Sequence, residues 1–357
     1  MSVIVLITGA AGFIGSNAVA WLLRQHPDVT VISFDALTYA AHPESLAMAT
    51  RGHDDRHHFV RGDVRDGTAL AAVLAGGVRD ATGRPTPRPD LIWHLAAETH
   101  VDRSILDPAS FVDTNVTGTL RLLEALRDAR ALGHSARLVH VSTDEVYGSL
   151  APDESPFTEE RALAPSSPYA ASKAAADLLV QAWARTFGLD VVITRCSNNY
   201  GPFQFPEKLI PLMITRALAH EPLPVYGDGR QVRDWLHVDD HIAALWAVSV
   251  SSAREGRVFN IGAMMECENI AIVRGILDAL GGDPALITHV RDRPAHDRRY
   301  AMDATRLRTE TGWRSRVEFN EGLAATVRWY VEHEGWWRTV HGEARRAADA
   351  LYLTPNS

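Results

Sequence analysis

The first fifteen residues constrain the fold most strongly. An apolar run of strand length, residues 3–7, leads into a glycine-rich turn, Gly9-Ala10-Ala11-Gly12-Phe13-Ile14-Gly15, and then a helical pattern through Leu23. A strand, a glycine turn and a helix open a βαβ unit, in which backbone N–H groups at the helix N-terminus can bind a pyrophosphate. The G-x-x-G-x-x-G spacing alone is weak evidence, because glycine-rich turns are common. No G-x-x-x-x-G-K-[ST] sequence is present, which argues against a P-loop.

A second apolar strand strengthens the nucleotide hypothesis. Residues 29–34 end at Asp35, twenty residues past Gly15. A carboxylate at this place can accept both ribose hydroxyls of a dinucleotide and would repel a 2′-phosphate. The sequence therefore predicts an NAD site and favours NAD over NADP. A solvated acid at a strand end is the competing interpretation.

Strands and helices continue to alternate along the first half of the chain. Further strand patterns cover residues 58–61, 90–95, 137–142 and 190–194, with helix-length segments between most of them and a surface excursion at 76–89. This alternation predicts an α/β fold with a doubly wound parallel sheet of Rossmann type. Beyond residue 196 the chain becomes rich in turns. We expect an NAD-binding domain at 1–195 and a smaller C-terminal substrate-binding lobe at 196–357, from which some segments return to the first domain.

Two short clusters carry the chemistry. Thr143, Asp144 and Glu145 follow the fifth strand, at a carboxyl end where open α/β sheets bind ligands. Tyr169 and Lys173 are four residues apart on a predicted helix, so the ammonium lies beside the phenol and can lower its pKa. The hydroxyl of Thr143 can hold a substrate oxygen, and the two carboxyls can act as acid and base. These groups suit hydride transfer coupled to elimination, although a solvated loop pair is the ordinary interpretation of two adjacent acids.

Composition indicates a globular enzyme rather than a nucleic-acid or membrane protein. The 357-residue chain carries a net charge of −8, which argues against nucleic acid as the main partner. Its longest apolar stretches fall short of the ~20 residues that span a membrane. Only two cysteines are present, so we expect no disulfide framework and a cytoplasmic location. His237 and His241 flank two acids, but a solvated helix start is favoured over a metal site, and we expect no metal.

These motifs resemble a known family. Residues 8–16, the run 142–148 and the Tyr169-x-x-x-Lys173 pair are similar to the extended short-chain dehydrogenase/reductase superfamily. The match sharpens to the dTDP-glucose 4,6-dehydratases through residues 94–104, 196–202, 206–211, 233–235 and 292–300. The sequence departs from that family at Arg195, where Asn is more frequent, at 263–265, at Ala295 and in the longer 76–89 excursion.

The resemblance implies a set of site residues. The catalytic group is Thr143, Asp144, Glu145, Tyr169 and Lys173. The cofactor contacts, which include the glycines of the turn and Asp35, are Gly9, Gly12, Phe13, Ile14, Gly15, Asp35, Ala36, Leu37, Thr38, Asp63, Val64, Leu95, Ala96, Ala97, Thr99, Thr114, Tyr169, Lys173 and Asn198. The implied substrate contacts are Thr99, Thr143, Asn198, Lys208, Leu209, Pro224, Tyr226, Arg233, Asn269, Asp292 and His296.

The resemblance also implies a reaction and an assembly. Tyr169 would take the 4-hydroxyl proton of dTDP-glucose during C4 oxidation by NAD, Glu145 would take the C5 proton, and Asp144 would protonate the departing 6-hydroxyl. Return of the hydride to C6 gives dTDP-4-keto-6-deoxyglucose. Helices near 108–132 and 166–187 would build the four-helix interface of a homodimer. A UDP-sugar 4-epimerase, a decarboxylase and a non-catalytic NAD-binding regulator are the alternatives, and the Asp144-Glu145 pair argues against an epimerase.

Overall fold

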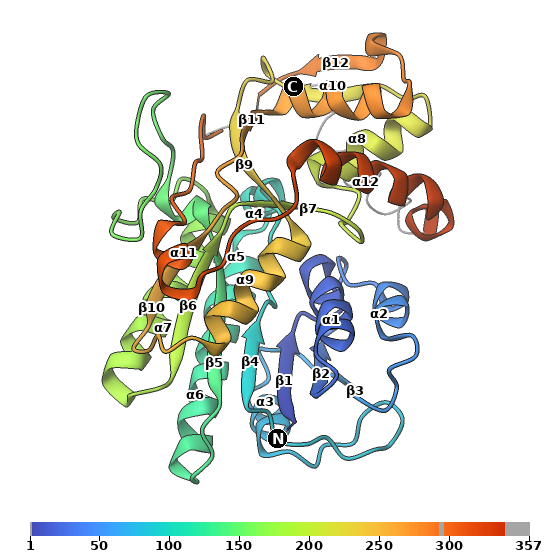
Figure 1. Cartoon of the computed structure of the whole chain (residues 1–357). Coiled ribbons are helices and arrows are strands. Elements are labelled where there is room, and N and C mark those ends of the chain that lie inside the picture. Colours follow the sequence, from blue (N-terminus) through green and yellow to red (C-terminus); the bar gives the residue numbers. More distant parts are fainter. Residues whose placement is uncertain (1, 293–295, 340–357) are drawn as a thin grey trace.

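A seven-stranded parallel sheet forms the centre of the larger lobe. The computed structural model describes residues 2–292 and 296–339 (Figure 1). The strands of this sheet are β1 (Val3–Thr8), β2 (Val29–Asp35), β3 (His57–Arg61), β4 (Leu91–His94), β5 (Arg137–Thr143), β6 (Val191–Cys196) and β10 (Arg257–Ile261). Their order is β10-β6-β5-β4-β1-β2-β3, and every neighbouring pair is parallel. The predicted doubly wound sheet is therefore confirmed.

Helices cover both faces of this sheet, because its strands are apolar on both sides. On β1, Val5 and Ile7 join one core and Leu6 joins the other. The first face is covered by α1 (Phe13–Gln25), α2 (Pro43–Thr50) and α9 (Val238–Val250), and the second by α3 (Gly67–Ala75), α6 (Gly118–Ala131) and α7 (Pro168–Phe187). In the part of the chain that is described, no helix combines the length and apolar character needed to cross a membrane.

The segment predicted as one helix at 108–132 is broken by a π-helical turn. It consists of α5 (Pro108–Phe111), η1 (Val112–Thr117) and α6, and it follows the short helix α4 (Val101–Leu106). The π turn holds Asn115, whose side-chain amide contacts the backbone of Glu98 and donates to Ser172 Oγ at 2.8 Å. Single π turns are frequent at functional sites, and this one joins the loop after β4 to α7.

The smaller lobe is built around a second core. It contains a sheet of β7 (Asn198–Tyr200), β9 (Val232–His237) and β11 (Glu266–Glu268), and a pair of β8 (Leu223–Tyr226) and β12 (Ile287–Val290). Helices α8 (Leu209–Leu218), α10 (Asn269–Leu280) and α12 (Phe319–Glu332) pack together beside them. Two short 3-10 turns complete the elements: η2 (Asp144–Tyr147) follows β5, and η3 (Pro284–Leu286) precedes β12. Strand β10 and helix α11 (Thr305–Thr311) return to the larger lobe, as Figure 1 shows. Residues 293–295, which include the departure at Ala295, and residues 340–357 lie outside the described part of the chain.

The 76–89 excursion folds against the outer strand of the sheet. Ala81 N donates to Phe59 O on β3 at 2.9 Å. The buried carboxylate of Asp80 accepts hydrogen bonds from Thr82 and Arg84 and lies 2.7 Å from His58 Nδ1. Part of the open edge of β3 is thereby paired, and unpaired edges otherwise invite association with other strands.

Candidate active site

The glycine turn lies where the strand order reverses between β1 and β4. Gly9 has φ of +71°, and a Cβ there would lie 2.7 Å from Ala96 N. A Cβ on Gly15 would lie 2.1 Å from Gly9 O. Side chains at either position would therefore separate the turn from β4 or from α1. The requirement for glycine follows from close packing of strand, turn and helix, which leaves the N-terminus of α1 open to a ligand.

Asp35 is held at the end of β2 by the turn itself. Its Oδ2 accepts Ala11 N at 2.8 Å and its Oδ1 accepts Leu37 N at 2.7 Å. Burial raises the pKa of Asp35, and the two backbone hydrogen bonds oppose this rise. Each oxygen keeps lone-pair capacity for a further donor, as two ribose hydroxyls would require.

One cavity of about 380 Å³ joins the glycine turn to the catalytic cluster. Of the predicted cofactor residues, every one except Leu37 lines it. All five predicted catalytic residues line it as well. The predicted substrate residues that line it are Thr99, Thr143, Asn198 and Lys208. The structure therefore brings the cofactor and catalytic predictions into a single space, and the residues present fit a dinucleotide.

Thr143 organises the turn that carries the two acids. It ends β5 and caps η2, with its Oγ1 accepting Glu145 N at 3.3 Å and donating to Asp144 Oδ1 at 3.2 Å. Asp144 is 2% exposed, and its Oδ2 has no hydrogen-bond partner among the described residues. Burial and the neighbouring Glu145 raise the pKa of Asp144 well above its usual value, while Arg233 opposes the rise. Burial therefore favours the protonated form of Asp144 more than water would.

Tyr169 and Lys173 lie on the first turns of α7, facing β5. Ser167 caps this helix by accepting Ala170 N at 3.1 Å, and Lys173 Nζ donates to Val141 O at 2.8 Å. Burial, then Glu145, raise the pKa of Tyr169 well above its usual value, and a hydrogen bond with Thr143 opposes this. The predicted lowering of the Tyr169 pKa is wrong, because desolvation and the neighbouring Glu145 raise it. Burial also lowers the pKa of Lys173.

Two predicted cofactor residues differ from expectation in their contacts. Leu37 does not line the cavity. Its backbone has φ of +57°, and its N–H donates to Asp35 Oδ1. Asp63, one of the predicted cofactor contacts, pairs with Arg65 at 2.6 Å between Oδ2 and Nη2. Arg65 also lines the cavity, and its side-chain hydrogen bond lowers the pKa of Asp63.

Most predicted substrate residues lie in the smaller lobe, outside the cavity lining. They are Leu209, Pro224, Tyr226, Arg233, Asn269, Asp292 and His296. Several contact one another: His296 Nδ1 lies 2.5 Å from Asp292 Oδ1, and the Tyr226 ring lies edge-on to His296. Arg233 packs over Tyr300 and affects the pKa of Asp144, so this group approaches the catalytic end of the cavity. Two arginines of the same lobe form ion pairs, Arg298 with Asp228 and Arg299 with Glu266.

Sequence reasoning left several cavity residues out of the predicted site. They include Arg65, Glu98, Ser142, Cys196, Ser197, Gln204, Phe205 and Glu207. Five of the eight, Arg65, Glu98, Ser142, Ser197 and Glu207, are adjacent in sequence to a predicted residue, so position in the chain could have found them. A further signal was composition, because the chain has only two lysines, Lys173 and Lys208, and both line the cavity.

A parallel sheet with a glycine turn at its reversal point, and a buried Tyr–Lys pair beside it, define an extended short-chain dehydrogenase/reductase. The family model described as GDP-mannose 4,6 dehydratase matches residues 6–326. A curated dTDP-glucose 4,6-dehydratase of Streptomyces griseus is 50% identical over 95% of this chain and 98% of its own length, and one of Xanthomonas campestris is 48% identical over 94% and 95%. The chain belongs to this family of nucleotide-sugar 4,6-dehydratases.

Solved structures agree with the sequence relatives. The dTDP-glucose 4,6-dehydratase of Streptomyces venezuelae, crystallised with NAD, has a TM-score of 0.86 at 47% identity. The match covers 94% of this chain and 99% of that one. A UDP-glucose 4-epimerase of Thermotoga maritima is more distant, with a TM-score of 0.80 at 27% identity over 92% of this chain and 99% of its own. The fold is therefore shared by two reactions, and the side chains of the site must distinguish them.

Proposed function

We propose that the chain is an NAD-dependent hydro-lyase that converts dTDP-glucose into dTDP-4-keto-6-deoxyglucose and water. The observation that carries this proposal is the buried carboxyl of Asp144, whose pKa burial raises, lining one cavity with Tyr169. Oxidation at C4 needs only the phenol, whereas expulsion of a hydroxyl needs an acid as well. The curated relatives named dTDP-glucose 4,6-dehydratase support the same assignment.

The glycine turn, Asp35 and the loops after β3 and β4 would hold NAD. Backbone N–H groups at the start of α1 suit its pyrophosphate, and Asp35 suits the adenosine ribose. When bound, NAD supplies a positive charge that favours the phenolate, oxidation at C4 and the matching reduction at C6. Gly9 would allow the backbone to approach this group closely.

Tyr169 and its neighbours would begin the reaction. Tyr169 takes the proton of the 4-hydroxyl, while Thr143 holds the same oxygen by a hydrogen bond. Lys173 supplies the cation on the same helical face, anchored by Val141 O. A ketone at C4 then acidifies the C5–H bond, which prepares the elimination.

Glu145 and Asp144 would complete the elimination. Glu145 takes the C5 proton, and Asp144 donates its proton to the departing 6-hydroxyl, so that water leaves. Glu145 later returns a proton to C5. The raised pKa of Asp144 supports the acid role, because burial favours the form of the carboxyl that carries the proton. Each of these acid–base roles is typically worth ~10²–10⁴ in rate.

We place the nucleotide and diphosphate of the substrate against the smaller lobe. Lys208 Nζ lies 3.0 Å from Thr99 O at the cavity wall, and Arg233 is buried nearby. Arginine forks and an ammonium suit diphosphate oxygens. On this basis residues 1–195 form the cofactor domain, and 196–357 form most of the substrate lobe.

Incubation of the purified protein with dTDP-glucose and, separately, UDP-glucose tests the assignment. We expect loss of one water from dTDP-glucose, measured by mass spectrometry, and a much slower reaction with UDP-glucose. A product of unchanged mass would instead identify a 4-epimerase, and release of carbon dioxide from a UDP-uronic acid would identify a decarboxylase. A protein that binds NAD and leaves all three sugar nucleotides unchanged would be a regulator.

We further propose a homodimer built through α6 and α7 with the preceding short helices. Exposed apolar side chains gather on these elements, including Leu106 at 74%, Val112 at 50% and Leu178 at 56% exposure. Light scattering at micromolar concentration is expected to give twice the chain mass. Leu178→Glu is expected to lower it to the monomer, while Val250→Glu, at the exposed end of α9, serves as the control. We propose a cytoplasmic location for the enzyme.

A further inference from the structure

A row of polar side chains crosses the central sheet beneath the cavity. Thr8, His94 and His140 occupy paired positions on β1, β4 and β5. On β6 the residue that faces His140 is Ile193, and the row continues two residues farther along at Arg195, which pairs with Asn260 on β10. All five polar residues are 2% exposed or less. Buried polar groups in a parallel sheet are costly unless they are satisfied, so this row calls for an explanation beyond packing.

The centre of the row is an ion pair between α7 and β6. Arg195 Nε donates to Asp177 Oδ2 at 2.8 Å, and both side chains are 3% exposed or less. The other oxygen of Asp177 lies 3.4 Å from His140 Nε2, an electrostatic contact rather than a good hydrogen bond. A buried ion pair is seldom worth its desolvation cost in stability alone. A role in the neighbouring site would account for it.

The pair contacts both elements that carry the catalytic residues. Asp177 is one helical turn after Lys173 on the same face of α7. Arg195 Nη1 donates to the hydroxyl of Tyr147 at 2.8 Å, and Tyr147 ends η2, the turn that begins at Asp144. The Tyr147 hydroxyl in turn donates to Asn260 Oδ1 at 2.7 Å. Arg195 and Asp177 therefore connect the lysine of α7 to the acid-bearing turn.

The charges around Lys173 single out Asp177. The ionisable groups that surround Lys173 are His94 on β4, His140 on β5, Cys196 on β6, Asp144 and Glu145 on η2, and Tyr169 and Asp177 on α7. Burial lowers the pKa of both histidines and raises that of Cys196 to about 12, so these three are neutral near pH 7. Asp177 raises the pKa of Lys173 against the effect of burial, and His140 and Arg195 lower that of Asp177.

We propose that Asp177 and Arg195 are positioning residues, a buried ion pair that holds Lys173 charged on α7 and fixes η2 through Tyr147. The pair thereby sets how the lysine and Asp144 face one sugar, a consequence that rests on the proposed dehydratase function. Arg195 pairs directly with Asp177, whereas Lys173 interacts with that carboxylate only at longer range and donates its hydrogen bond to Val141 O, so Lys173 keeps a net positive field in the site. A neutral residue at position 195 would leave Asp177 to neutralise Lys173 alone.

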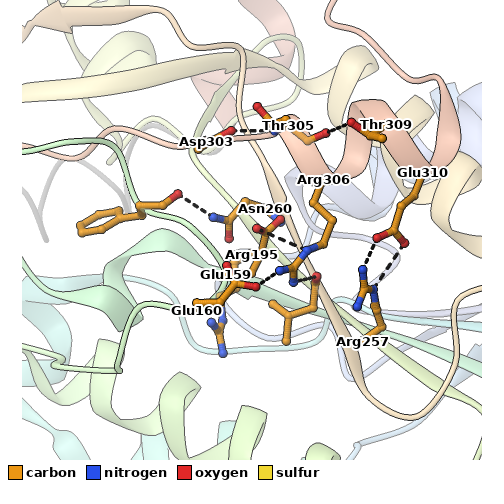
Figure 2. Close-up of polar contacts among 12 residues, drawn as sticks. Glu159, Glu160, Arg195, Arg257, Asn260, Asp303, Thr305, Arg306, Thr309 and Glu310 are labelled. Atoms are coloured by element: carbon orange, nitrogen blue, oxygen red, sulfur yellow. Dashed lines mark hydrogen bonds and ion pairs between the residues drawn. The ribbon is translucent and has the colours of Figure 1, made fainter.

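The surroundings of Arg195 provide a matched control. Arg195 pairs with Asn260 across β6 and β10, and Asn260 N donates to Glu159 Oε1 at 3.0 Å. Figure 2 shows Arg306 reaching the carboxylates of Glu159 and Glu160. Farther along, Arg257 on β10 pairs with Glu310 on α11. The side chain of Arg257 is 45% exposed, against 3% for Arg195. Arg257→Gln therefore removes an arginine–carboxylate pair at the adjacent strand without touching the buried row.

The scarcity of lysine makes the proposal directly measurable. A protein labelled with [ε-¹³C]lysine should give two signals, from Lys173 and Lys208, and Lys208→Arg assigns them. Titration of the Lys173 signal in the full chain gives its protonation midpoint, with Lys208 as the reference in the same spectrum. This reading does not depend on turnover, so it stands whether or not dTDP-glucose is the substrate.

The two members of the pair are expected to affect the Lys173 midpoint differently. Asp177→Asn removes the opposite charge and should lower the midpoint by about one pH unit or more. Arg195→Gln removes a like charge and should leave the midpoint unchanged or raise it. The double variant, which leaves no unpaired buried ion, should fall between them, and Arg257→Gln should match the wild type. In an active enzyme the alkaline limb of the kcat/KM profile should follow these shifts.

Several results would overturn the proposal. If Asp177→Asn leaves the Lys173 midpoint where it was, or if both single variants lower it alike, the pair is only structural. If either single variant fails to fold, the Lys173 midpoint of the double variant is compared with that of the wild type. A midpoint of the double variant that is equal to or above the wild-type value contradicts the coupling. Absence of water loss from dTDP-glucose with the wild type, together with the predicted midpoints, would refute the proposed function and not the positioning role.

Discussion

Asp144→Asn separates the elimination from the oxidation and also has a worked effect on stability. The side chain keeps its size, so the turn that Thr143 caps is expected to remain. Asparagine cannot supply the proton that the 6-hydroxyl needs, so turnover should fall ~10²–10⁴-fold. Oxidation at C4 depends on Tyr169 and should continue, so that bound NADH accumulates after dTDP-glucose is added.

The same substitution should change the pH dependence of stability. Burial and Glu145 raise the pKa of Asp144 above its ordinary 3.8. The folded chain therefore binds more protons than the unfolded chain between that value and the folded pKa, and the free energy of unfolding falls as pH rises through this window. The slope is at most about 1.4 kcal/mol per pH unit. Asparagine does not titrate, so the free energy of unfolding of the variant does not show this decrease. The variant should therefore gain stability relative to wild type as pH rises above about 4.

Urea denaturation at a series of pH values measures the stability difference, and stopped-flow absorbance measures bound NADH. Asp153→Asn, at an exposed site, controls for removal of a carboxylate. A wild-type rate of water loss in Asp144→Asn would refute the acid role. A stability difference independent of pH would show that Asp144 is not held protonated by burial.

Other substitutions test the remaining parts of the site. Tyr169→Phe should keep its edge-on packing against Phe111 and its thermal stability while losing C4 oxidation, as measured by NADH formation. Asp35→Ala removes the acceptor of two backbone amides and of the proposed ribose contact, so NAD binding measured by calorimetry should weaken at least ~10-fold, and unchanged affinity would contradict the assignment. Gly9→Ala forces a Cβ against Ala96 and a left-handed backbone, so chemical denaturation should show a loss of ~1–3 kcal/mol.

Much of the fold was predictable because local patterns agree with the global arrangement. The apolar strand runs, the glycine turn and Asp35 gave the parallel sheet and the reversal point. The break at 112–117 was not predictable, because an extra backbone residue in a helical turn leaves the apolar spacing almost unchanged. The return of β10 to the larger sheet is likewise set by tertiary packing and not by its own short sequence.

The site was predictable in position and less so in electrostatics. Strand ends and helical spacing placed Asp144, Tyr169 and Lys173 in one cavity. The pKa of Tyr169 was predicted in the wrong direction, because sequence shows which charges are near but not how deeply they are buried. The ion pair of Asp177 with Arg195 was missed for a related reason, since it joins a helix and a strand whose contact is set by packing.

Product analysis in deuterated water tests the central claim most directly, namely that the phenol and both carboxyls act on one hexose. The account predicts that dTDP-glucose loses one water and that the product carries solvent deuterium at C5, placed there by Glu145. A sugar nucleotide that keeps its oxygen, or a dehydrated product without deuterium at C5, would contradict it.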